Sequence, residues 1–173
     1  MLKLFVLAGL AVVASAAGAE VRAGGVPYQS FQTTNGAGSC QAALPSYEVN
    51  LRKRPTAIAN EGQTNAFVSC SIASDFGEVQ SLHTYAVVLN NNTAGDVEMS
   101  CTLVSGIRMN GLFEPTYFPR TFVVPAGGHS EVSWRRSELE PTPTEASANW
   151  SCNLPPGTEV GATYAIVMVM PAG

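Results

Sequence analysis

The fold class follows from one stretch near the middle of the chain, Val97-Glu98-Met99-Ser100-Cys101-Thr102-Leu103. Its odd-numbered residues are apolar and its even-numbered residues are polar, without exception. This period of two places all apolar side chains on one face of a β-strand, whereas a helix would repeat them every three to four residues. The stretch therefore predicts a half-buried strand whose inward face carries Cys101.

Two further stretches alternate in the same way, and each carries a cysteine on its apolar side. They are Ala66-Phe67-Val68-Ser69-Cys70-Ser71-Ile72 and Asn149-Trp150-Ser151-Cys152-Asn153-Leu154. Three of the four cysteines are thus expected on the inward faces of strands, where a disulfide between neighbouring or facing strands would be packed.

β-Branched and aromatic runs, separated by clusters of Asn, Gly and Pro, predict the remaining strands. These strands are expected at residues 30–33, 47–51, 84–90, 107–113, 120–124, 130–134 and 160–170. Apolar residues do not recur at helical spacing over three turns, so crossover helices are not expected. The sequence therefore predicts an all-β fold, an antiparallel β-sandwich of the jelly-roll type.

The four cysteines, Cys40, Cys70, Cys101 and Cys152, favour two disulfides that fasten the sandwich. They contain no C-x-x-C motif, which excludes redox-dithiol and zinc-ribbon interpretations. Four cysteines allow three connectivities, and spacing alone does not choose among them. The strand pattern favours Cys101–Cys152 with Cys40–Cys70, and we expect the bridges to cross-link the two layers.

The first residues predict export from the cytoplasm. Lys3 is followed by an apolar run and then by small residues ending in Ala17-Gly18-Ala19, the layout of a secretory signal peptide over residues 1–19. The run is shorter than the ~20 residues of a membrane-spanning helix. Residues 20–35 are expected to form a mobile segment, with at most a short strand in it, and residues 36–173 a single domain. The protein is then secreted, to the periplasm or the extracellular space.

Composition narrows the classes of function. The 173 residues are 46% hydrophobic and 13% charged, with a formal net charge of −4. Ample apolar content with low net charge argues against disorder, and the acidic balance argues against a nucleic-acid binder.

The chain resembles a group of small exported bacterial β-sandwich proteins with strand-borne cysteines, a group without an assigned function. The resemblance covers roughly residues 65–170. It is carried by Phe67-Val68-Ser69-Cys70, Tyr85-Ala86-Val87-Val88-Leu89, Met99-Ser100-Cys101-Thr102-Leu103 and Trp150-Ser151-Cys152-Asn153-Leu154-Pro155-Pro156-Gly157. It implies two β-sheets and a periplasmic or extracellular location, and it implies no catalytic residue, ligand or partner.

Catalytic motifs are absent from the sequence. The histidines His83 and His129 have no metal-ligand spacing, and the segment Gly128-His129-Ser130-Glu131-Val132 lacks the final glycine of a nucleophile elbow. A non-enzymatic binding or structural module at the cell envelope is therefore favoured. The alternatives are a small secreted hydrolase, using Ser130 with His83 and Asp75 or Asp96, and an inhibitor or effector that acts through a projecting loop at 113–119 or 137–148.

Oxygen-rich side chains between Asn90 and Glu98 raise a further alternative. Calcium prefers such oxygen ligands, but the segment lacks an EF-hand spacing and Asn is common in hairpin turns. No cofactor is therefore predicted, with calcium as the one alternative.

The candidate binding surface consists of aromatic residues. Phe113, Tyr117 and Phe118 lie within the expected loop 113–119, which contains two prolines, and Trp134 ends an expected strand beside Arg135. Exposed rings on a polar surface can stack on sugar rings, which makes polysaccharide or another envelope component the expected partner. The alternative is that these rings cap the core of the sandwich.

Overall fold

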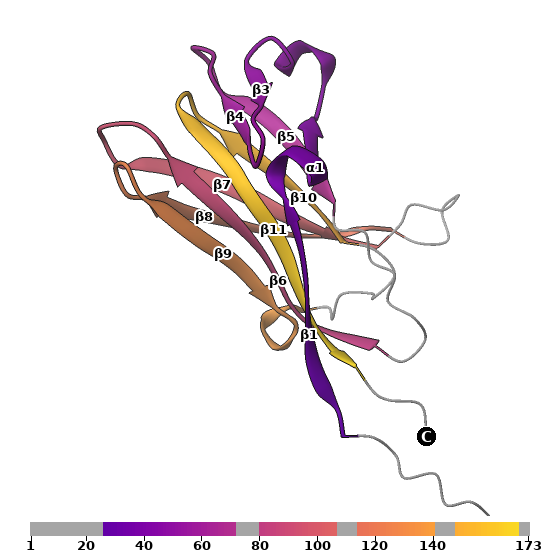
Figure 1. The fold of residues 1–173 in the computed structure, drawn as a ribbon. Coiled ribbons are helices and arrows are strands. Elements are labelled where there is room, and N and C mark those ends of the chain that lie inside the picture. Colours follow the sequence, from indigo (N-terminus) through magenta and orange to yellow (C-terminus); the bar gives the residue numbers. More distant parts are fainter. Residues whose placement is uncertain (1–25, 72–79, 107–113, 141–147, 170–173) are drawn as a thin grey trace, which may run out of the picture.

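The structure is a computed structural model and describes residues 26–71, 80–106, 114–140 and 148–169. The described residues form two antiparallel sheets, which confirms the all-β prediction (Figure 1). Sheet A contains β1 (Tyr28–Asn35), β3 (Leu51–Lys53), β4 (Ile58–Asn60), β6 (Gln80–Asn91), β9 (His129–Arg135) and β11 (Thr158–Val169). Sheet B contains β2 (Cys40–Ala42), β5 (Ala66–Ser71), β7 (Val97–Ser105), β8 (Thr116–Val124) and β10 (Ala148–Leu154). Three short helical turns complete these elements: α1 (Gly36–Ser39), η1 (Pro45–Tyr47) and η2 (Arg136–Glu138).

Strands β4 to β11 are connected as a jelly roll. The order in sheet A is β4-β11-β6-β9 and the order in sheet B is β5-β10-β7-β8, with β3 and β2 added at one edge of each. The pairs β4·β11, β5·β10, β6·β9 and β7·β8 are all antiparallel. These are the pairs of one long hairpin wrapped around itself, which is how a jelly roll is built.

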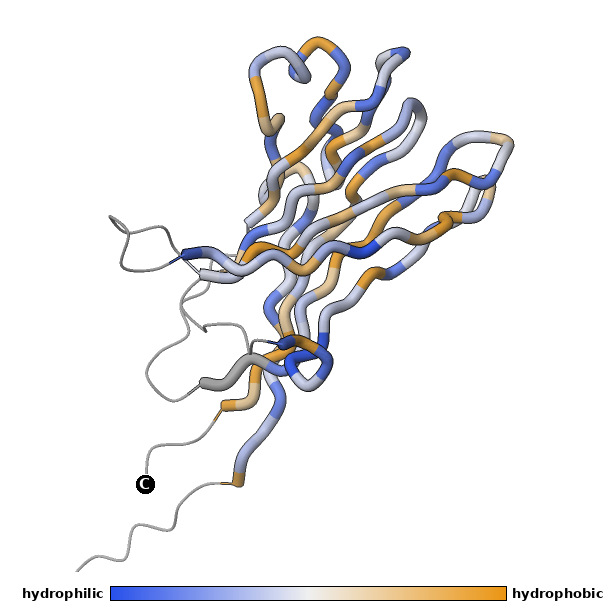
Figure 2. Tube along the Cα trace, turned by 180° about the vertical axis from the view of Figure 1, so that it is seen from behind, coloured by the Kyte–Doolittle hydropathy of each residue, from blue (hydrophilic) through white to orange (hydrophobic). Residues whose placement is uncertain are grey.

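The apolar side chains of both sheets meet in one core. Hydrophobic and hydrophilic residues alternate along the strands (Figure 2), as the period of two requires. Tyr85 of sheet A meets Trp150 of sheet B edge-on, with ring centroids 5.7 Å apart. The indole N–H of Trp134 donates to the carbonyl oxygen of Phe118 at 2.9 Å, a second link between the sheets.

Both disulfides lie within sheet B. Cys40 is bonded to Cys70 and Cys101 to Cys152, the pairing that the strand pattern favoured. Each bridge joins directly opposed residues of neighbouring strands, β2 with β5 and β7 with β10. The expectation that the bridges cross-link the two layers was wrong, because adjacent inward-facing cysteines can reach each other without crossing the core.

The N-terminal boundary also differs from the prediction. Residues 20–35 were expected to be mobile, but β1 pairs with β11 along its whole length, from Tyr28 opposite Val169 to Asn35 opposite Ala162. The strand lacks a clear apolar alternation because it is an edge strand with many polar side chains. The expected signal peptide, residues 1–19, lies outside the described residues.

The turn α1 carries the chain from sheet A to sheet B. The Asn35 side chain caps it by accepting from the backbone N–H of Gly38 at 2.7 Å. Gly36 is buried against β11, where a Cβ atom would overlap the carbonyl oxygen of Val160.

We predict that Gly36→Ala lowers the free energy of unfolding by about 2–3 kcal/mol, because the methyl group must displace backbone of β11. Gly38→Ala in the same turn is the control: its Cβ would meet only side chains, those of Asn35 at 3.3 Å and Thr34 at 3.5 Å. Urea denaturation measures both variants. Equal stability of the two would show that the turn is not packed on β11 as described.

Within the described ranges, no helix is both long enough and apolar enough to cross a membrane.

Candidate functional site

The outer face of sheet B is polar over most of its width. In β5, β7 and β10 the residues that point into the core alternate with half-buried or exposed ones that point away from it. The outward positions are occupied mainly by Ser, Thr and Asn, and the strand register aligns them in rows across the sheet.

The central row crosses four strands. Gln41 of β2 is opposite Ser69 of β5, Ser69 is opposite Ser151 of β10, and Ser151 is opposite Thr102 of β7. Every side chain in this row is an amide or a hydroxyl, so each donates and accepts hydrogen bonds without carrying charge.

The second row is displaced from the central row by two residues along each strand, and it ends at an aromatic ring. Ser71 is opposite Asn149, Asn149 is opposite Val104, and Val104 is opposite Tyr117 of β8. Tyr117 is 62% exposed, so its ring stands on the same face as the polar rows.

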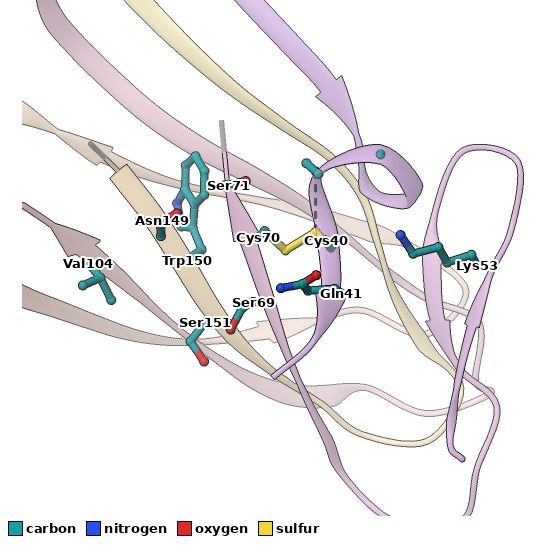
Figure 3. Close-up of a pocket in the computed structure, with 12 residues that line it drawn as sticks. Cys40, Gln41, Lys53, Ser69, Cys70, Ser71, Val104, Asn149, Trp150 and Ser151 are labelled. Atoms are coloured by element: carbon teal, nitrogen blue, oxygen red, sulfur yellow. Dashed lines mark hydrogen bonds between the residues drawn. A yellow bond between two sulfur atoms is a disulfide. The ribbon is translucent and has the colours of Figure 1, made fainter. Parts of the chain in front are cut away.

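A hollow of ≈ 430 Å³ follows these rows and is here named the sheet B groove. Figure 3 shows Ser69, Ser151 and Val104, three of the outward-facing side chains that line it. The groove crosses β2, β5, β10 and β7, three strand spacings, or about 14 Å. An extended chain of a few linked rings fits this length and direction.

Aromatic side chains flank the groove on two sides. Tyr117 stands next to Val104, beyond the end of the hollow. Phe67 stands one outward position from Ser69 on β5 and is 38% exposed, with the ring of Tyr47 packed against it at 5.8 Å. The groove thus combines uncharged hydrogen-bonding groups with exposed aromatic rings at its borders.

One charged residue, Lys53 of β3, lines the groove among the residues that the structure describes. The carboxylate on this face of β7, Glu98, lies beyond the polar rows, opposite Val123. Among the described residues a shifted pKa is found on the other sheet, where burial, with a hydrogen bond and charge from Glu131, raises the pKa of Tyr164 to about 12.

The aromatic binding surface expected from the sequence is largely wrong. Trp134 is fully buried and Phe118 is 9% exposed, because both lie on the inward phase of their strands. The guanidinium of Arg120 lies 6.0 Å from the ring centroid of Trp134. Of the four candidates only Tyr117 is shown on the surface, and Phe113 lies outside the described residues.

The proposed hydrolase residues are not brought together. Ser130 is opposite Leu89 on β6, six residues from His83 along that strand, which is about 20 Å. The His83 ring instead contacts the Thr84 hydroxyl at 2.8 Å, and Asp96 accepts from the backbone N–H of Ala126 at 3.0 Å. Asp75 lies outside the described residues.

In the Asn-rich turn, which was considered as a calcium site, side-chain oxygens accept hydrogen bonds from neighbouring residues. Asn91 is fully buried: its amide donates to the carbonyl oxygen of Gly95 at 2.8 Å and its side-chain oxygen accepts from the backbone N–H of Thr93 at 2.9 Å. The described residues contain no cluster of three His, Cys, Asp or Glu side chains that could hold a metal ion. The turn is therefore held by hydrogen bonds between its own residues.

Neither expected projecting loop has an apolar tip in the described residues. Residues 116–119 belong to β8 and pair with β7, and Leu139 after η2 is buried. Exposed apolar side chains occur instead at Leu44 and Val49, on either side of η1.

The polar rows were not predicted, because each strand was assigned from its apolar, inward-facing residues alone. The signal was present in the other phase: within the stretch 97–103 and in 149–154, the outward residues are Ser, Thr or Asn apart from Glu98. A solubilising strand surface would ordinarily carry more Lys and Glu.

No protein-family model and no curated protein matches the chain. Among solved structures, a Clostridium thermocellum CBM22-1–GH10 segment of endo-1,4-beta-D-xylanase 10B, complexed with xylohexaose, matches at 13% identity and a TM-score of 0.43. That alignment covers 81% of this chain and 27% of the other, so the chain spans about a quarter of its length. The family 11 carbohydrate-binding module from the same organism, bound to a mixed-linked tetrasaccharide, matches at 10% identity and a TM-score of 0.35 over 85% of this chain and 88% of that one. TmCBM61 with β-1,4-galactotriose gives 8% identity and a TM-score of 0.30 over 82% and 88%.

Proposed function

We propose that the protein is a secreted carbohydrate-binding module that holds an oligosaccharide in the sheet B groove without cleaving it. The observation that carries the proposal is the in-register row of Gln41, Ser69 and Ser151, which presents uncharged hydrogen-bonding groups along a hollow of ≈ 430 Å³ and continues on β7 at Thr102. Ligand sites of this kind place a few polar groups in a concave surface that is already formed.

The aromatic side chains support the same ligand class. A sugar ring has polar edges and two less polar faces, so it matches a surface that combines hydroxyl and amide groups with exposed rings. Tyr117 and Phe67 supply those rings at the borders of the polar rows. Two side-chain torsions fix a tyrosine, so little conformational entropy is lost when its ring becomes a platform.

Rigidity of the groove also favours binding. Cys40 and Cys70 are among the residues that line the groove, and their disulfide joins β2 with β5, whereas Cys101–Cys152 joins the next two strands of the sheet, β7 and β10. Holding four strands in fixed register keeps the polar rows aligned before the ligand arrives, which reduces the ordering cost of binding. Disulfides of this kind, with the leader-like residues 1–19, support the secreted location.

Retention on polysaccharides tests the proposal. The full chain is passed through gels containing xylan, mixed-linked β-glucan, galactan or polygalacturonate, and we expect at least one of them to retard it. Tyr117→Ala should weaken that retention about five- to tenfold, as expected for the loss of one stacked ring. Tyr28→Ala is the matched control, because Tyr28 is also exposed but lies on sheet A. Migration unchanged by every polysaccharide, or equal retention of the Tyr117→Ala and wild-type chains, would contradict the assignment.

A further inference from the structure

Lys53 stands out among the residues of the groove because of its charge. It is the last residue of β3, at the rim that faces β2, and it is exposed. In Figure 3 its side chain extends towards β2, so that the ammonium group faces Cys40 and Gln41. The other described lining residues are neutral, so any charge selectivity of the groove comes from this one group.

Lys53 belongs to the basic run Arg52-Lys53-Arg54, and its two neighbours are already engaged. The Arg52 guanidinium donates to the carbonyl oxygens of Glu48, Val49 and Leu51, at 3.3, 3.3 and 2.9 Å. Arg54 forms an ion pair with Glu61. Arg52 precedes Lys53 in β3 and therefore points to the opposite side of the strand, and neither arginine lines the groove.

No ion pair joins Lys53 to a carboxylate in the part of the chain that the structure describes. Glu48 lines, together with Lys53, a separate and smaller hollow of ≈ 190 Å³. Of the three basic side chains in the run, Lys53 is therefore the one whose positive charge is available to a ligand in the groove.

We infer that the sheet B groove prefers a sugar chain that carries carboxylates, a uronate polymer, and that Lys53 recognises the carboxylate. The inference rests on the proposed function and narrows its ligand class. The hydroxyl rows bind the sugar rings, and the ammonium group binds one carboxylate at the β2 end by a charge-assisted hydrogen bond. Because the whole chain has a net charge of −4, the attraction is local rather than a property of the entire surface.

Trimers of galacturonate and mannuronate test this inference, each compared with its methyl ester. The ester keeps the rings and removes the charge. Titration calorimetry of the full chain should show about fivefold tighter binding of the acid at low salt, and the difference should shrink as salt is added. Lys53→Met should remove the preference by weakening acid binding about fivefold while leaving ester binding unchanged, and Lys53→Arg should retain the preference.

Arg54→Met is the charge-matched control, because it removes one positive charge outside the groove and should leave the preference intact. Equal binding of acid and ester by the wild-type chain, or a preference that survives Lys53→Met, would overturn the role of Lys53 while the proposed function stands. If the acid, the ester and neutral oligosaccharides all fail to bind, the proposed function falls as well.

Discussion

Replacing Cys101 and Cys152 together by alanine is expected to lower the free energy of unfolding by about 4 kcal/mol. The bridge closes a sequence separation of 51 residues, and its main effect is to restrict the unfolded chain. Both residues are also buried in the core, so their loss loosens the pairing of β7 with β10. Urea denaturation under non-reducing conditions measures the change.

The second bridge provides the comparison for the first. Cys40–Cys70 closes a separation of 30 residues, for which the same reasoning gives about 3.6 kcal/mol. Both double variants should therefore be destabilised by similar amounts. A loss of less than 1 kcal/mol in either variant would show that the corresponding bridge is not formed in the native protein.

Trp134→Ala is expected to lower the free energy of unfolding by about 3–5 kcal/mol, the usual cost of removing a large buried ring. The ring is fully buried, and its N–H satisfies the carbonyl oxygen of Phe118 across the core. Tyr117→Ala, by contrast, removes an exposed ring and should change stability by no more than about 0.5 kcal/mol.

Trp134→Ala should have the larger effect on stability, whereas Tyr117→Ala should have the larger effect on binding. At a temperature where Trp134→Ala remains folded, it should bind oligosaccharide like the wild-type chain, whereas Tyr117→Ala should bind more weakly. If Trp134→Ala were as stable as the wild-type chain but had lost binding, Trp134 would have to lie on the binding surface, which would contradict its burial in the core.

The sequence predicted those parts of the fold in which one face of a strand is buried and the other is not. The segments around Cys70, Cys101 and Cys152 alternate cleanly because they form the middle of sheet B, and all three were placed correctly. Only the middle of β1, residues 30–33, was expected, and α1 was not foreseen, because Ser, Thr, Gln and Asn occupy both faces of that edge. Burial of Gly36 depends on β11, which is more than a hundred residues away, so no local pattern reveals it.

The candidate site was harder to predict than the fold, for a related reason. Aromatic residues are obvious candidates for a binding surface. Trp134, however, lies on the same face of its strand as Val132 and therefore points into the core. The polar side chains of the groove come instead from β2, β5 and β10, and they become a row only through the register of sheet B. Register is set by tertiary packing, whereas the alternation of a single strand shows only which residues point outward.

The most direct test of the groove is a map of backbone amide chemical shifts during titration with an oligosaccharide that retards the protein. We expect the largest changes at Gln41, Ser69 and Ser151, with smaller ones at Tyr117 and little change on β9 of sheet A. Saturable shifts confined to another surface, such as the hollow of ≈ 530 Å³ beside Asn92 and Gly157 at the loop end, would contradict the assignment of the site.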